Sequence, residues 1–198
     1  MCIRDRIKHV PHDPALKVHT VWDLGVGKNL AIGFYQRVTN ELRMIDYWQG
    51  DEKDGMPQAI KMLKDKTYVY GNHFAPHDIM ATEQGTGLTK LETARNLGIS
   101  FEVIPSLSVD DGINAGRLMF ARLWVDEANC ALWLDAIANY HQEWDEKRGM
   151  FIEKPYHDWS SHGADVHRYA SIVANKMTND EPMQSRIYQN RLKNKSFK

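Results

Sequence analysis

The sequence has 198 residues, of which 26% are charged and 42% apolar, the size and composition of one folded domain. No apolar stretch approaches the roughly 18 residues of a membrane span, and two cysteines are too few for a disulfide framework, so both of those protein classes are excluded. With 25 basic and 26 acidic side chains the net charge is −1, which argues against binding nucleic acid by overall charge alone.

The N-terminal half is predicted to open with three consecutive antiparallel strands. Residues 1–16 lack the apolar segment of a signal peptide, and we interpret them as a leader or linker remnant outside the fold. Three runs rich in β-branched and aromatic residues follow, over 19–23, 30–38 and 41–48. The two-residue break at Thr39 and Asn40 makes the last two a hairpin.

Helices and strands alternate through the middle of the chain. Pro57 suits the first turn of a helix over 58–64. Thr89 and Glu92 have the spacing of a capping box, which predicts a second helix over 89–97 that ends at Gly98. Short strands are predicted after each helix, over 68–70 and 100–104.

Helices dominate the rest of the chain. They are predicted over 109–123, over 127–140 and from about 160 to 176, with a hairpin turning on Gly149 before the last one. The order of elements indicates an α/β fold: a mixed β-sheet with three antiparallel strands first, then crossover strands, flanked by helices. This is the ribonuclease H-like order, and we place that domain at 17–177, followed by a basic C-terminal tail over 178–198.

Three aspartates carry the chemical signal. Asp23 closes the first strand, Asp78 follows the fourth, and Asp165 lies in the first turns of the last helix. If the first and fourth strands are neighbours, these carboxylates meet at one end of the sheet. Clustered ionised carboxylates repel, so a cation is needed, and Mg²⁺ or Mn²⁺ suits oxygen ligands. Two such ions can stabilise the attacking and leaving oxygens in a displacement at phosphorus. The alternative is that each aspartate merely ends its element.

Several segments resemble the nuclease domain of the large terminase subunit of tailed double-stranded DNA bacteriophages. They are 76–78 and 157–169, with shorter stretches at 21–25, 68–73, 92–99, 111–117 and 140–145, and the resemblance covers about residues 18–175. It implies a ribonuclease H-like endonuclease that cuts concatemeric viral DNA, with Asp23, Asp78 and Asp165 as ligands of two Mg²⁺ or Mn²⁺ ions.

The resemblance also implies partners and a location. The partners are double-stranded DNA, the portal protein and the small terminase subunit, and the location is the cytoplasm of the infected bacterial host, with no membrane involved. We expect no ATPase motor in this chain, because Gly25, Gly27 and Lys28 lack the spacing of a phosphate-binding loop.

Four more side chains near these motifs have two interpretations each. Asp158 is either a fourth metal ligand or the cap of the last helix. His77 and His162 either support the metal site or contact DNA, or are ordinary partly buried histidines. Arg168 pairs either with a phosphate or with a carboxylate.

Two other functions stay open. The first is another ribonuclease H-like nuclease, an RNase H or a Holliday-junction resolvase, which competition between RNA–DNA hybrids, four-way junctions and linear duplex would reveal. The second is a non-catalytic module that docks on the portal or the small terminase subunit, which absence of metal binding together with retained partner binding would reveal.

Overall fold

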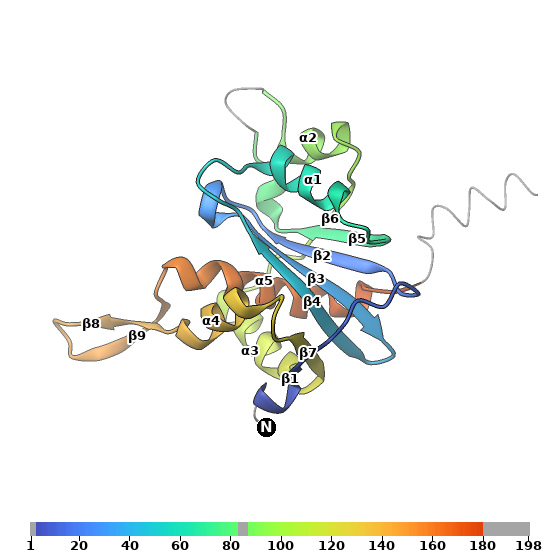
Figure 1. The fold of residues 1–198 in the computed structure, drawn as a ribbon. Helices are drawn as coiled ribbons and strands as arrows, with labels where there is room; N and C mark the ends of the chain where they lie inside the picture. Colours follow the sequence, from blue (N-terminus) through green and yellow to red (C-terminus); the bar gives the residue numbers. More distant parts are fainter. Residues whose placement is uncertain (1–2, 83–86, 180–198) are drawn as a thin grey trace, which may run out of the picture.

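The computed structural model describes residues 3–82 and 87–179. Its main sheet has seven strands in the order β1-β7-β4-β3-β2-β5-β6, and a separate hairpin, β8–β9, projects from the body (Figure 1). The strands are β1 (Ile7–Lys8), β2 (Val18–Asp23), β3 (Ala31–Val38), β4 (Glu41–Gln49), β5 (Tyr70–Ala75), β6 (Phe101–Val103), β7 (Leu123–Asp126), β8 (Gln142–Asp145) and β9 (Met150–Pro155). The α-helices are α1 (Met56–Asp65), α2 (Lys90–Asn96), α3 (Val109–Met119), α4 (Ala131–Asn139) and α5 (Trp159–Val173).

The sheet is mixed, as predicted. Strands β2, β3 and β4 pair antiparallel, whereas β5 pairs parallel with β2, β6 with β5, β7 with β4, and β1 with β7. The predicted direct pairing of the first and fourth strands is therefore confirmed, with Val21 opposite Phe74. Because these two strands are parallel, their carboxyl ends lie at the same edge of the sheet.

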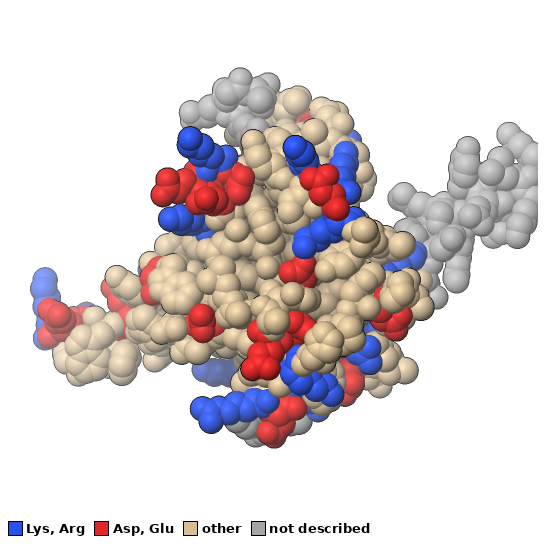
Figure 2. Space-filling view, viewed as in Figure 1, with Lys and Arg blue, Asp and Glu red and all other residues tan. Residues whose placement is uncertain are grey.

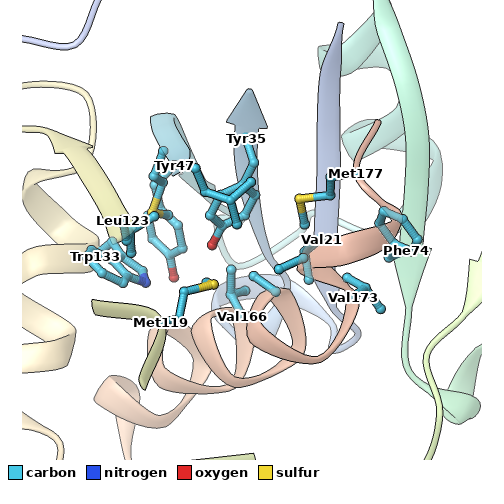
Figure 3. Close-up of a cluster of buried hydrophobic side chains, with 14 of the residues drawn as sticks. Val21, Tyr35, Tyr47, Phe74, Met119, Leu123, Trp133, Val166, Val173 and Met177 are labelled. Atoms are coloured by element: carbon cyan, nitrogen blue, oxygen red, sulfur yellow. The ribbon is translucent and has the colours of Figure 1, made fainter. Parts of the chain in front are cut away.

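Helices cover both faces of the sheet. Helix α5 lies on one face and α1 and α2 on the other (Figure 1). On the α5 face, Val166 and Val173 join Val21 and Tyr35 in one buried cluster (Figure 3). A second cluster lies under α1 and α2 and includes Ile60, Leu63 and Leu91. The central strand β3 is consequently buried on both sides, which is why its sequence is a continuous apolar run rather than an alternating one.

Helix α5 is held close to α4. A Cβ atom at Gly163 would lie only 2.7 Å from Cβ of Ala136, so only glycine permits this approach. The indole N–H of Trp133 donates to the carbonyl oxygen of Gly163 at 3.0 Å. These contacts fix the position of the helix turn that carries Asp165.

Three predicted elements have different bounds in the structure. The strand predicted over 68–70 is β5, which begins at Tyr70 and runs to Ala75. The helix predicted over 109–123 ends at Met119, and after a 3-10 turn the chain forms β7. The short apolar run of β7 is compatible with a helix or with a buried strand, and its pairing with β4 makes it a strand. Helix α4 begins later than predicted because Asp126 first accepts the N–H groups of Ala128 and Asn129.

The N-terminal segment contributes to the fold, so the prediction that residues 1–16 lie outside it is wrong for β1 and Val10. Strand β1 pairs with β7, and the N–H of the buried Val10 donates to Asp126 Oδ2 at 2.7 Å. This pairing joins residues more than a hundred positions apart, so no local sequence pattern predicts it. Residues 1–2 of the expected leader and 180–198 of the expected basic tail lie outside the described residues. Within the described part, no helix has the length and apolar character needed to cross a bilayer.

Candidate active site

The three predicted aspartates lie on elements that converge at one edge of the sheet. Asp23 is the last residue of β2, and Asp78 lies in the 3-10 turn His77–Met80 that follows β5. Asp165 is in the second turn of α5, the helix that packs on β2 and β3. The folded chain therefore directs three sequence-distant carboxylates to the carboxyl ends of β2 and β5.

The negative charges of all three carboxylates raise the pKa of Tyr169. It lies one helical turn after Asp165, on the same side of α5. Its pKa is raised above the usual value, chiefly by burial and then by the negative charges of Asp165, Asp23 and Asp78. The three aspartates are therefore close enough to act electrostatically on one phenol.

Each of these aspartates contacts a basic side chain, and the three basic residues are the ones singled out from the sequence. The pairs are His162 Nδ1 with Asp23 Oδ2 at 3.0 Å, His77 Nε2 with Asp78 Oδ1 at 3.0 Å, and Arg168 Nη2 with Asp165 Oδ1 at 2.7 Å. Asp23 and Asp165 are largely buried, with side chains 14% and 23% exposed, whereas Asp78 is 55% exposed. The site thus consists of acid–base pairs rather than bare carboxylates.

The carboxyl group of Asp165 lies in an environment that disfavours its charge. Burial raises its pKa, and the negative charge of Asp23 adds to that effect. The positive charge of Arg168 acts in the opposite direction without reversing it. Further positive charge next to Asp165 would stabilise its ionised form.

Asp158 caps helix α5. Its Oδ1 accepts the backbone N–H of Ser160 at 2.9 Å and the hydroxyl of Ser160 at 2.6 Å. These hydrogen bonds lower the pKa of Asp158. Of the two interpretations drawn from the sequence, the cap is the one present here, and direct metal ligation stays a prediction.

An asparagine substitution separates these two roles of Asp158. Asparagine caps helices as well as aspartate, so we expect Asp158→Asn to leave the free energy of unfolding unchanged and Asp158→Ala to lower it by about 1 kcal/mol. Urea unfolding measures both changes. A stable Asp158→Asn protein that binds Mn²⁺ more weakly than the parent would identify Asp158 as a ligand instead.

Two adjoining pockets open beside Asp165, between α3, α5 and the base of the β8–β9 hairpin. The smaller, about 430 Å³, is lined by Asp165, Arg168, Lys154 and His157 among others. The larger, about 640 Å³, shares Arg168 with the smaller one and is not lined by Asp165. Lys154 and Tyr169 were not singled out from the sequence; the spacing of Tyr169 four residues after Asp165 is the signal that identifies it.

The donor set fits a hard divalent cation in its chemistry. Carboxylate oxygens are the ligands that Mg²⁺ and Mn²⁺ prefer, and the negative charges of Asp23 and Asp165 lie close enough to repel each other. Over residues 3–82 and 87–179, however, no three His, Cys, Asp or Glu side chains are grouped as metal ligands. The carboxylate oxygens are instead engaged by their basic neighbours.

Solved structures match the chain where sequence comparisons do not. No protein-family model and no curated protein matches the sequence. The nuclease domain of the P22 large terminase is 16% identical, with 88% of this chain and 90% of that one aligned at a TM-score of 0.63. The nuclease domain of the bacteriophage SPP1 large terminase, solved with bound Mn, is 16% identical over 86% and 96%, with a TM-score of 0.60.

A longer protein matches equally well. The large terminase of a thermophilic bacteriophage is 16% identical, with 90% of this chain aligned at a TM-score of 0.63. This chain spans 44% of that protein. The fold is thus the ribonuclease H-like fold of large terminase nuclease domains, and the fold predicted from the sequence is confirmed.

Proposed function

We propose that this chain is a divalent-metal-dependent endonuclease, the nuclease domain of a phage large terminase that cuts concatemeric double-stranded DNA during genome packaging. One observation carries the proposal. Asp23 ends β2, Asp78 follows the parallel neighbour β5, and Asp165 lies on the helix that packs on β2, in a fold shared with terminase nuclease domains. A metal-bound structure of one such domain is consistent with metal use here.

Asp23, Asp78 and Asp165 are the residues that would hold two Mg²⁺ or Mn²⁺ ions. When bound, the ions supply positive charge to the attacking and leaving oxygens at phosphorus. The chain itself supplies orientation: His162 holds Asp23, His77 holds Asp78 and Arg168 holds Asp165. These contacts fix the direction of the carboxylates before any substrate arrives.

DNA would be held by local cations rather than by a broad positive surface. Lysine and arginine side chains are interspersed with acidic ones on the face shown in Figure 2. Close to Asp165, however, Lys154, His157 and Arg168 line the same pocket. Contacts of this kind bind the phosphate backbone, so affinity falls with rising salt and carries little sequence preference. The portal protein and the small terminase subunit are further partners that the proposal implies, in the cytoplasm of the infected cell.

A plasmid assay tests the proposal. We expect supercoiled DNA to be nicked in the presence of Mn²⁺ or Mg²⁺ and to stay intact after chelation with EDTA, because the carboxylates alone have no means of stabilising charge at phosphorus. RNA–DNA hybrids and four-way junctions, added as competitors, should slow the cutting of duplex DNA no more than added linear duplex does. If the protein binds neither metal ion and cuts no DNA, it is not a metal-dependent nuclease.

A further inference from the structure

Arg168 engages one oxygen of Asp165 with two hydrogen bonds. Its Nε donates to Asp165 Oδ1 at 3.1 Å, and its Nη2 donates to the same atom at 2.7 Å. A carboxylate oxygen has about two lone pairs directed at partners. Oδ1 therefore cannot accept both guanidinium bonds and coordinate a divalent ion at the same time.

The guanidinium is held in this position from the other side. A Cβ atom at Gly112 of α3 would lie 2.5 Å from both Cγ and Cδ of Arg168, so the arginine stem passes directly beneath the α3 backbone. Its guanidinium carbon also lies 4.9 Å from the ring centre of Tyr169. The contact with Asp165 is thus part of a packed arrangement and not a loose surface pair.

Arg168 also has space to leave Asp165. It lines both pockets, and the smaller of them contains Asp165 together with Lys154 and His157. A guanidinium that moves into this pocket joins Lys154 and His157, and the pocket also contains the carboxylates of Asp165 and Glu143. The planar fork of the guanidinium is suited to binding two oxygens of a phosphate.

We propose that Arg168 is an internal competitor of the metal ion: it occupies Asp165 Oδ1 while the site is empty of metal, and on metal binding it transfers to a phosphate of the DNA backbone in the adjoining pocket. The inference rests on the proposed nuclease function and names a step within it. Arg168 is in this sense a positioning residue whose two partners are mutually exclusive, which couples metal loading to DNA binding.

The test measures Mn²⁺ and DNA binding separately, in the full chain. Isothermal titration calorimetry with Mn²⁺ alone should give an affinity about tenfold higher for Arg168→Gln than for the parent, since a positive charge in contact with the ligand oxygen is removed. Duplex DNA binding in Ca²⁺ should weaken by a similar factor. Arg117→Gln, which removes the same charge from the larger pocket only, should change neither value.

Gly112→Ala provides a second route that keeps the arginine. The added methyl group must displace the Arg168 stem, whereas alanine in a helix is itself favourable, so a folded protein with tighter Mn²⁺ binding is expected. If Mn²⁺ binding is unchanged or weaker in both variants while the parent binds Mn²⁺ and cuts DNA, Arg168 does not compete with the metal ion. The nuclease proposal is then unaffected. Tighter Mn²⁺ binding with unchanged DNA affinity overturns the transfer to phosphate. A parent that neither binds Mn²⁺ nor cuts DNA overturns the nuclease proposal itself.

Discussion

Asp23→Asn and Asp165→Asn are each expected to reduce the initial rate of Mn²⁺-dependent plasmid nicking by at least about 10²–10³-fold, the loss typical of removing one group that stabilises transition-state charge. Asparagine keeps the shape of aspartate and removes its negative charge. Both carboxylates are largely buried and each contacts a basic group from α5, so water cannot easily replace them. The effect should appear in Mn²⁺ affinity as well as in the rate.

The control for this experiment is a third aspartate with the same change. Asp110 lies in the first turn of α3 and lines the larger pocket, whereas Asp165 lines only the smaller one. Asp110→Asn should cut DNA at the parental rate. Circular dichroism melting shows whether each variant is folded. Parental cutting by a folded Asp23→Asn or Asp165→Asn protein would remove that residue from the site.

Elements with local signals were predictable from the sequence. Thr89 caps α2 as expected: its hydroxyl accepts the N–H of Glu92 at 3.1 Å, and the Glu92 carboxylate accepts the N–H of Thr89 at 2.8 Å. The β8–β9 hairpin turns at Gly149, which adopts a φ of 63° that glycine tolerates best. In both cases the residues that determine the geometry are within a few positions of one another.

Strands defined by distant pairing were not predictable in the same way. Val125 of β7 lies opposite Met44 on one side and Ile7 on the other, so its strand exists only because two remote segments flank it. In the sequence alone, the apolar residues around Val125 continue the helical pattern of the preceding segment. The N-terminal segment was left out of the fold for the same reason, since its partner lies far along the chain.

The candidate site shows the same division. The aspartates were recognisable because they end or follow short strands or lie in the first turns of a helix, and Arg168 lies three residues after Asp165, a local helical spacing. The partner of His162 was not recognisable, because Asp23 lies 139 residues away. Which basic group neutralises which carboxylate depends on how α5 packs on the sheet, and only the folded chain determines it.

Three buried histidines make the stability of the fold depend on pH: His19, His73 and His167 of α5, whose pKa is likewise lowered by burial from 6.5 to about 4. His19 of β2 and His73 of β5 are 0% and 9% exposed. Burial lowers the pKa of each from 6.5 to about 4, with a smaller effect from Lys17 on His19 and from His19 on His73. Both rings are used as neutral groups: His19 Nδ1 accepts the N–H of Asn72 at 3.0 Å, and His73 Nδ1 lies 2.7 Å from the Thr20 hydroxyl.

The direction of the pH effect follows from these values. Between about pH 6.5 and pH 4 the unfolded chain binds protons on these histidines while the folded chain does not, so the free energy of unfolding falls as the pH falls. Each histidine accounts for about 3 kcal/mol at pH 4. Together they are comparable to the whole stability of a typical domain, about 5–15 kcal/mol, so we expect acid unfolding at about pH 4–5.

Urea unfolding at pH 7.5, 6 and 5 measures the effect. The slope of the unfolding free energy against pH should be about one third less steep in His73→Gln, because one of the three titrating groups is gone and the hydrogen bond to Thr20 can be kept by the amide. His141→Gln, which changes an exposed histidine, should leave the slope unaltered. A parental unfolding free energy that is constant from pH 7.5 to 5 would mean that these rings take up protons in the folded protein, with water reaching the strand pair that supports Asp23 and Asp78.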